Sequence, residues 1–311
     1  MGSLVISLDA ELAWGVHDLY PLSDERETQV AVARDAWTKL VDLFEEYRVP
    51  ATWAVVGHLL IEDGDEFRRR HPLGEEWFGQ AIRGLADRPD RWLGIDLVDS
   101  IRTSPVDHEI GSHSFSHVVF DKTTAAVADA ECRLARKAAA EHGLDTQSFV
   151  FPRNAIGHRR ALSEAGFTCY RGPRPWRLPA LPGVRGGSAL VSAATGLRSP
   201  PIVTPRVTDY GLVEIPASMF LGKFRGELWS GLATLGADPV VQLATLGIDR
   251  VCERSGIVHF WLHPNDLTHD IYVKRIKKIL SHAAKRRDER GLRIETMGTV
   301  ADRINGERVD E

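Results

Sequence analysis

Short apolar runs alternate with segments of helical periodicity along most of this chain. Residues 4–8 form a continuous apolar run, which is typical of a strand buried on both faces of a parallel sheet. Apolar residues then recur at helical spacing between Val30 and Phe44, and Pro50 ends this pattern. Residues 51–56 form a second apolar run. The pattern therefore predicts a strand, a helix and a second strand within the first sixty residues.

The same alternation continues to the other end of the chain. A short strand is expected to lead into Gly111, and a short helix is expected to end the chain. The other predicted strands cover residues 148–151, 167–170, 212–215, 257–262 and 292–295. The other predicted helices cover residues 123–142, 158–165, 239–254 and 271–287. Repeated strand–helix units with right-handed crossovers predict a parallel sheet or a barrel, whose functional residues lie at the carboxyl ends of the strands.

Two segments interrupt the alternation. Residues 62–105 are charged and aromatic and contain three prolines, so we interpret them as short helices in an insertion. Residues 172–206 are rich in Pro, Gly and Ser, and a long loop of this kind in a compact domain often covers or binds a ligand. We therefore interpret residues 1–311 as a single domain with an insertion near 62–105 and a loop near 172–206.

Composition and charge exclude several classes of protein. The 311 residues are 43% hydrophobic and 26% charged, as in ordinary soluble domains, and the net charge of −4 offers no basic face for nucleic acid. No run reaches the ~18 apolar residues of a membrane span. The first residues lack the basic region of a signal peptide, so we expect a cytoplasmic location. The three isolated cysteines, without a CxxC pair, argue against a disulfide framework and a zinc–thiolate site.

Polar residues that could carry chemistry follow several of the predicted strands. Asp9 and Glu11 come directly after the first one, and carboxylates two residues apart can point into one cavity if the chain is still extended. His113 and His117 share a face if their segment turns helically, close enough to hold one metal ion. On its own, this pair also fits two hydrogen-bonded surface histidines. Two histidines, a carboxylate and positions open to water together indicate a catalytic metal site.

Two further strand ends carry candidate residues. Arg153 and Asn154 follow the strand at 148–151, and an arginine in a cleft can pair with a carboxylate and hold it ionised. In the strand at 257–262, alternate residues project to one side, so His259 and His263 are expected on the same side. His263 lies at the carboxyl end and is the better candidate for proton transfer, whereas His259 is expected in the core or behind the site.

Taken in order, these motifs resemble the polysaccharide deacetylase (NodB-like) family, and especially the branch with an aspartate-x-glutamate first motif and an FPRN third motif. Shorter segments at residues 51–53, 170–173 and 296–298 also resemble the family, so the resemblance extends over nearly the whole chain. The main motifs that carry it are Ser7-Leu8-Asp9-Ala10-Glu11, His113-Ser114-Phe115-Ser116-His117, Phe151-Pro152-Arg153-Asn154 and Leu262-His263-Pro264.

The resemblance implies an α/β fold, a distorted (β/α) barrel of about seven parallel strands, with a divalent metal that is usually zinc, cobalt and manganese being alternatives. It implies hydrolysis of an N-acetyl or similar group on a sugar. Carried over to this sequence, it makes Asp9 the general base, His263 the general acid, His113 and His117 metal ligands, and Arg153 the residue that orients Asp9.

The sequence departs from the commonest family pattern in its first and third motifs. That pattern has two adjacent aspartates, the second of which binds the metal, whereas Ala10 stands at this second position here. We assign Glu11 to the metal, since its longer side chain, one residue further on, can still reach it. The third motif reads Pro-Arg where many members have Arg-x-Pro, so Arg153 reaches Asp9 by a different route.

Several residues are assigned to the substrate. An aromatic face can pack on a pyranose, and an arginine can bind a phosphate or carboxylate, as on a nucleotide- or lipid-linked sugar. The residues assigned in this way are Trp14, Trp176 and Trp261 as platforms, and Asn154, Arg171 and Arg174 as polar contacts.

Two other functions remain open from the sequence. One is a metal-independent amidohydrolase that acts on a small cyclic or linear amide, as some relatives of this branch do. The other is an inactive carbohydrate-binding module. The presence of both Asp9 and His263, beyond what metal binding requires, argues against the latter.

Overall fold

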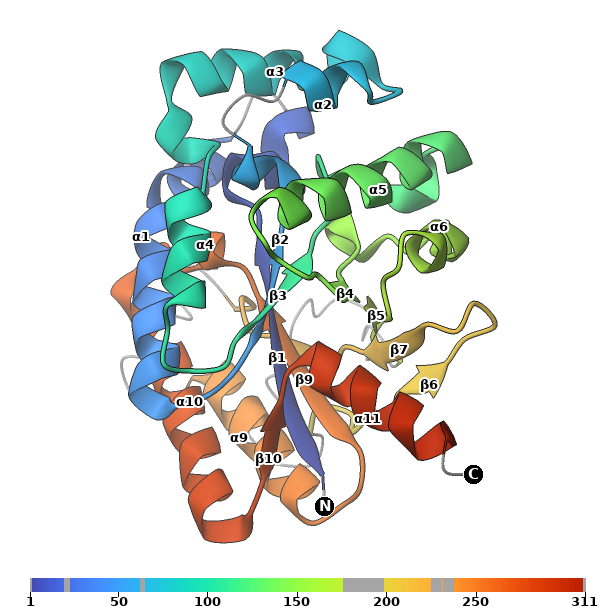
Figure 1. Cartoon of the computed structure of the whole chain (residues 1–311). Coiled ribbons are helices and arrows are strands. Elements are labelled where there is room, and N and C mark those ends of the chain that lie inside the picture. The colour runs from blue at the N-terminus through green and yellow to red at the C-terminus, as the bar shows by residue number, and fades with distance from the viewer. Residues whose placement is uncertain are drawn as a thin grey trace, which may run out of the picture.

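The chain is organised around one curled, mostly parallel β-sheet (Figure 1). The computed structural model describes residues 2–19, 23–61, 65–175, 199–224, 231 and 238–309. The strands are β1 (Ser3–Ala10), β2 (Thr52–Val55), β3 (Glu109–Ser112), β4 (Ser148–Phe149), β5 (Cys169–Gly172), β6 (Arg206–Val207), β7 (Val213–Pro216), β8 (Met219–Phe220), β9 (Ile257–Leu262) and β10 (Arg293–Glu295).

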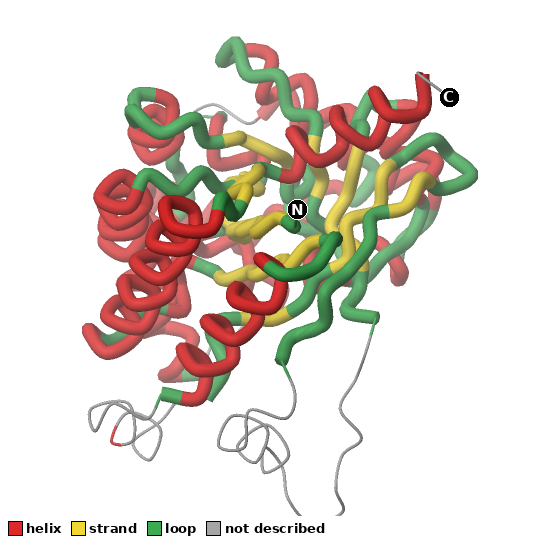
Figure 2. The backbone as a smooth tube through the Cα atoms, turned by 90° about the horizontal axis from the view of Figure 1, so that it is seen from below, coloured by secondary structure: helices red, strands yellow, loops and turns green. Residues whose placement is uncertain are grey.

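The helices lie outside the curl of the sheet, as the view from below shows (Figure 2). They are α1 (Asp24–Tyr47), α2 (Asp65–Arg69), α3 (Gly74–Asp87), α4 (Ile95–Arg102), α5 (Ala125–Glu141), α6 (Arg159–Glu164), α9 (Pro239–Cys252), α10 (Asp270–Arg290) and α11 (Met297–Val309). Short 3₁₀ turns join many of the elements: η1 (Leu12–Leu19), η2 (Gly57–Leu60), η3 (Pro89–Arg91), η4 (Phe120–Lys122), η5 (Pro152–Asn154) and η6 (Pro264–Asp266).

The strand order in the sheet is β6-β7-β5-β4-β3-β2-β1-β9-β8, and β10 also pairs with β1. Among these pairs, β6–β7 is antiparallel and the others are parallel. The first half of β1 lies beside β10, and its second half lies beside β2. β7 is second from one end of this order and β8 is the other end, yet only two residues separate them in sequence, so the sheet curls back on itself. This confirms the expected α/β, barrel-like fold.

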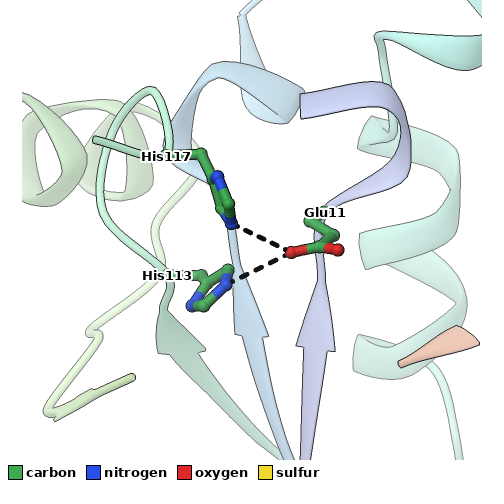
Figure 3. A group of neighbouring side chains, drawn as sticks. All are labelled: Glu11, His113 and His117. Atoms are coloured by element: carbon green, nitrogen blue, oxygen red, sulfur yellow. Dashed lines mark ion pairs between the residues drawn. The ribbon is translucent and has the colours of Figure 1, made fainter. Parts of the chain in front are cut away.

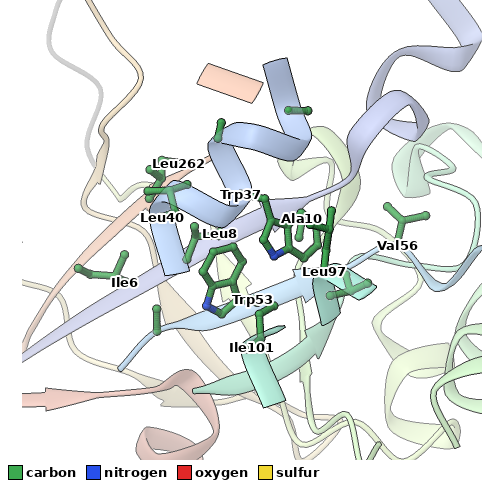
Figure 4. Close-up of a cluster of buried hydrophobic side chains, with 14 of the residues drawn as sticks. Ile6, Leu8, Ala10, Trp37, Leu40, Trp53, Val56, Leu97, Ile101 and Leu262 are labelled. Carbon is green, nitrogen blue, oxygen red and sulfur yellow. The ribbon is translucent and has the colours of Figure 1, made fainter. Parts of the chain in front are cut away.

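The central strand is buried throughout because one of its faces packs against helices and the other packs inside the curl of the sheet. Every residue of β1 is buried, as its continuous apolar run predicts. Behind it, Trp37 of α1 stacks on Trp53 of β2 with ring centroids 5.4 Å apart (Figure 4). Burying ~200 Å² of each indole is worth roughly 5 kcal/mol at about 25 cal/mol per Å². This core fixes the position of the carboxyl end of β1, where the candidate residues lie.

The segment interpreted as an insertion forms short helices, as expected for its described part, which begins at residue 65. Figure 1 shows α2 and α3 beyond the carboxyl ends of β1 and β2. Phe67 of α2 stacks on Phe115 with ring centroids 5.7 Å apart, and both belong to the main hydrophobic core. The insertion therefore packs directly on the loop that follows β3. The interpretation of the whole chain as one domain stays a prediction.

Local signals set the helix ends. Thr124 caps α5 by accepting a hydrogen bond from the Val127 amide. Asp238 caps α9 by accepting hydrogen bonds from the Val240 and Val241 amides. Gly143 follows α5 with φ of 69°, a left-handed conformation that glycine adopts without strain.

The structure corrects several boundaries. β1 extends to Ala10, so Asp9 lies within the strand rather than after it. β5 ends at Gly172 and therefore includes Arg171, which the sequence pattern assigned to a loop. The two-residue strands β6 and β8 were not predicted. With the eight strands that the sequence pattern predicts, they make ten among the described residues, more than the seven or so that the family resemblance implies. Most of the loop predicted at 172–206 lies outside the described residues. Of the described helices, none is long and apolar enough to cross a membrane.

Candidate active site

Three metal-binding side chains converge at the carboxyl ends of β1 and β3 (Figure 3). The Glu11 Oε2 atom lies 3.3 Å from His113 Nε2 and 3.1 Å from His117 Nε2. The potential ligand atoms of the three residues all lie within 4.8 Å of one another. A carboxylate and two imidazoles are a donor set for a catalytic divalent metal. The residues predicted to bind the metal are thus brought together.

The chain places Glu11 by a sharp change of direction after β1. Leu12 has φ of 46°, and η1 then turns back over the site. Gly15 lies against the Glu11 carboxyl group, where an added Cβ would come within 2.2 Å of it. A glycine at position 15 is therefore required for this placement of Glu11.

His113 and His117 approach each other without the helical turn that the sequence predicted. Their segment is an irregular loop, in which Ser114 and His117 have φ of 64° and 63°. The ring centroids are nevertheless 5.1 Å apart. His113 Nδ1 donates to the Val150 carbonyl oxygen at 2.8 Å, which leaves the unprotonated Nε2 facing Glu11. Nε2 of His113 is buried and has no hydrogen-bond partner, as expected of an atom that ligates a metal.

Asp9 lies beside this cluster, buried and ionised. Arg171 donates from Nη1 and Nη2 to its two carboxylate oxygens, at 2.5 and 2.8 Å. Burial raises the pKa of Asp9, but its net shift is below the usual value, and the charge of Arg171 is the largest cause that lowers it. Asp9 can therefore accept a proton at neutral pH.

The arginine that pairs with Asp9 is not the predicted one. Arg153, at φ of 55°, donates instead to Asp18 Oδ1 at 2.5 Å near the surface. Asn154 Oδ1 accepts from Arg171 Nε at 3.1 Å, and the contact of Asn154 with a substrate stays a prediction. The assignment of Arg171 to substrate is likewise corrected, since its guanidinium is buried in these contacts.

Arg171 is held from behind as well. Its Nη1 also donates to Ser7 Oγ at 3.2 Å, and Ser7 Oγ lies 2.9 Å from His259 Nε2. The guanidinium carbon lies 4.5 Å from the Trp261 ring centroid, a cation–π contact. His259 is fully buried behind the site, as expected from its position in the strand.

His263 completes the site from β9. Its Nε2 atom lies 3.6 Å from Asp9 Oδ2, and its Nδ1 donates to Asp266 Oδ2 at 3.0 Å. Sequence reasoning missed Asp266, although an aspartate three residues after a histidine, across a short turn, was a usable signal. Burial lowers the pKa of His263, and the charges of Glu11 and Asp9 only partly offset this effect. The imidazole is therefore neutral at rest, with its lone pair toward Asp9.

The aromatic residues assigned as sugar platforms have different surroundings. Trp14 is fully buried, stacks on His58 at 4.3 Å and donates to the Trp92 carbonyl oxygen, so it belongs to the core. Trp261 is half-buried and stacks on Phe220 at 4.2 Å. Trp176 lies outside the described residues.

A cleft of about 460 Å³ opens onto the site. Glu11 and His263 line it together with Phe220, Asn265 and Asp266. Glu11 and His263 thus face a space large enough for a sugar-sized substrate.

Comparison with known proteins gives a family match over part of the chain. The sequence model of the polysaccharide deacetylase family matches residues 28–170, a span that includes His113, His117 and Arg153. Within this span, the chain is similar to the polysaccharide deacetylase family. Members of this family are hydrolases that act on carbon–nitrogen bonds, and this is the class of enzyme that the chain resembles. Asp9, Glu11 and His263 lie outside the matched span, so their roles rest on the geometry of the site.

Solved structures share the fold at low sequence identity. A polysaccharide deacetylase homologue from Mycobacterium smegmatis is 14% identical, with a TM-score of 0.61 over 98% of this chain and 91% of that one. A second homologue, from Pseudomonas aeruginosa PAO1, is 13% identical, with a TM-score of 0.58 over 96% and 89%. Puue allantoinase gives the same values as this second homologue. No curated protein sequence matches the chain significantly.

Proposed function

We propose that this protein is a metal-dependent hydrolase that removes an N-acetyl or N-formyl group from an amino sugar of a glycan or glycan precursor. The observation that carries the proposal is the convergence of Glu11, His113 and His117 beside the Asp9–His263 pair. The match of residues 28–170 to the model of the polysaccharide deacetylase family supports a deacetylase. The complete set of proton-transfer groups argues against an inactive binding module.

The three ligands suit zinc, with cobalt or manganese as alternatives. Glu11, His113 and His117 would hold the ion through one oxygen and two nitrogen atoms and leave further positions open. Burial would raise the pKa of Glu11, but the neighbouring His263, His113 and His117 lower it well below its usual range, so a ligating carboxylate is available. When bound, a divalent metal supplies Lewis-acid polarisation of the amide carbonyl and acidification of a water molecule.

The protein's own groups supply the proton transfers. Asp9, kept ionised by Arg171, accepts a proton from the attacking water. The lone pair of His263 Nε2 faces Asp9 Oδ2 at 3.6 Å, so this proton can pass to His263. Asp266 holds the other side of the ring and stabilises the imidazolium that forms. His263 then protonates the leaving amine, which allows the C–N bond to break.

A nucleotide- or lipid-linked sugar is the proposed form of the substrate. Arg174 is half-buried just after β5, and within the described chain its Nε atom has no hydrogen-bond partner. Lys223 follows β8 next to residues that line the cleft. Burial and the charge of Arg174 both lower the pKa of Lys223, which indicates that two cations lie close together. A phosphate or carboxylate on the substrate would neutralise them. A biosynthetic intermediate of this kind fits the expected cytoplasmic location, which stays a prediction.

A second candidate function is hydrolysis of a small cyclic or linear amide without a metal. The likeness to Puue allantoinase favours it, because that protein shares the fold over most of both chains. In such an enzyme Asp9 and His263 would act on a water alone. Allantoin therefore belongs among the substrates to be tested.

An acyl-release screen tests the proposal. Acetate and formate would be measured from N-acetylated and N-formylated amino sugars, free, phosphorylated, nucleotide-linked and lipid-linked, with zinc or cobalt added or with chelator. We expect metal-dependent acyl release, with the highest kcat/KM on an anionic substrate. Turnover of allantoin alone, unaffected by chelator, would support the second candidate. Sugar binding with no release of either acid would support the binding module.

A further inference from the structure

The loop that carries both histidine ligands is anchored by a buried carboxylate from another element. Glu131 projects from α5 and is fully buried. Its Oε2 atom accepts hydrogen bonds from the backbone amides of Phe115 and Ser116, each at 2.9 Å. Its Oε1 atom accepts a hydrogen bond from the Ser116 hydroxyl. Three donors of the segment between His113 and His117 thus end on one side chain.

This anchor opposes an unfavourable backbone conformation. Ser114 and His117 both adopt positive φ, which costs of the order of 1–3 kcal/mol for a residue other than glycine unless the surroundings hold it. Residues 113–117 lie outside the helices and strands. The amides of Gly57 and His58 donate to the carbonyl oxygens of Ser114 and Phe115, each at 2.9 Å, but the amides of residues 115–117 need other partners. The hydrogen bonds to Glu131, together with that from the His117 amide to Ser114 Oγ at 3.0 Å, therefore maintain the turn.

The insertion closes the other side of the anchor. His71 Nδ1 accepts from the Leu73 amide at 3.2 Å, so its protonated Nε2 faces Glu131 Oε1, 2.9 Å away. Trp77 Nε1 donates to Ser116 Oγ at 2.9 Å. Burial alone would raise the pKa of Glu131, but His71 and Ser116 lower it, which keeps the carboxylate ionised. Two residues of the insertion thus complete the environment of this carboxylate.

We infer that Glu131 is a positioning residue for the metal centre, which acts through Phe115 and Ser116 to keep the imidazoles of His113 and His117 convergent. The inference rests on the metal site of the proposed function. Groups behind metal ligands typically contribute ~10–100-fold to metal affinity. Glu131 differs from most such groups because it fixes the backbone between the ligands rather than a ligand ring.

The test is a Co²⁺ titration of the chelator-treated full-length chain, followed by visible absorption, which reports on coordination geometry. Glu131→Gln keeps the size of the side chain but replaces one acceptor oxygen with a donor. We expect it to weaken Co²⁺ binding ~10–100-fold and to change the absorption bands. The matched control is Glu214→Gln, another buried carboxylate, which accepts hydrogen bonds from Tyr170 and Arg206 away from the ligands. The control should bind Co²⁺ as the unaltered protein does.

If Glu131→Gln does not fold, Ser116→Ala removes one of the three donors and leaves the carboxylate in place. It should weaken Co²⁺ binding by a smaller factor, with the bands shifted in the same direction. Unchanged Co²⁺ affinity and an unchanged spectrum in a folded variant would overturn the inference. This holds even if Glu131→Gln and Glu214→Gln lose thermal stability equally, because a loss of stability alone does not show a role at the metal site. Absence of Co²⁺ binding by the unaltered protein would overturn the metal site itself and, with it, this role of Glu131.

Discussion

The guanidinium of Arg171 binds both carboxylate oxygens of Asp9, at 2.5 and 2.8 Å, in the buried centre of the site. Removing one partner of a buried ion pair leaves the other charge uncompensated and typically costs about 3–5 kcal/mol. We expect Arg171→Met to lower the free energy of unfolding by about 3–5 kcal/mol and to lower kcat as well. Denaturant titration and acyl-release kinetics measure the two effects.

Arg153→Met is the matched control, because Arg153 pairs with Asp18 at a partly exposed position. An ion pair of this kind contributes about 0–1 kcal/mol. We expect the control to keep near-normal turnover and stability. A larger loss of activity from Arg153→Met than from Arg171→Met would return the orienting role to Arg153.

The role of Asp9 as base predicts a loss of turnover without loss of metal. Asp9→Asn keeps the shape of the side chain but removes the proton acceptor, and general-base catalysis typically contributes ~10²–10⁴-fold. We expect the kcat of the variant to fall by such a factor. Its metal content, measured by elemental analysis, should equal that of the unaltered protein. Near-normal turnover would remove Asp9 from this role.

The role of His263 predicts a dependence on the leaving group. Protonation of nitrogen matters less when the departing amine is a weak base, as in an anilide. We expect His263→Gln to lose much more activity on an N-acetyl amino sugar than on an N-acetyl anilide. Asp266→Asn should show the same bias with a smaller loss, since it only orients the ring. An equal loss on both substrates would argue against proton donation by His263.

Buried neutral histidines predict a fall in stability in mild acid. Burial and the neighbouring Arg68 lower the pKa of His58 to about 3, whereas an unfolded histidine titrates near 6.5. Between these two pH values the unfolded chain binds more protons than the folded chain. The free energy of unfolding therefore decreases as the pH is lowered, by up to about 1.4 kcal/mol per pH unit for one such group. The loss begins as the pH drops through ~6.5.

His58→Phe keeps a ring to stack on Trp14, where the imidazole now lies at 4.3 Å, and removes the titrating group. The decrease in Tm between pH 7.5 and pH 5.0 should be smaller for this variant than for the unaltered protein. His269→Phe, at an exposed position, is the control and should show the full decrease. An equal decrease in all three proteins would show that His58 does not contribute.

Most of the architecture could be predicted from the sequence because period and burial are local signals. The apolar run of β1 and the helical spacing of α1 each specify an element without tertiary information. The two-residue strands β6 and β8 carry too little pattern and exist only through their neighbours, β7 and β9.

The site was predictable in its residue types but not in its pairing. Asp9, Glu11, His113, His117 and His263 meet as expected. The sequence could not show which arginine reaches Asp9, because this depends on the backbone. The positive φ of Arg153 turns its side chain toward Asp18, and the extension of β5 brings Arg171 opposite Asp9.

Exposure was equally hard to predict. Trp14 lies close to Glu11 in sequence and was assigned to the substrate, yet η1 turns its ring into the core against His58. The anchor at Glu131 gave no sequence signal, since a single glutamate in a helix with charged neighbours is usually exposed.

Stoichiometric metal reconstitution tests the central claim, that Glu11, His113 and His117 hold a catalytic metal, most directly. Chelator-treated protein would be titrated with Zn²⁺ while acyl release from an N-acetylated amino sugar is followed, alongside Glu11→Gln. We expect activity to rise in proportion to bound zinc, to saturate near one ion per chain, and to be absent from the variant at the same zinc concentration. Full activity at less than about a tenth of an equivalent of metal, or an unchanged titration of Glu11→Gln, would contradict it.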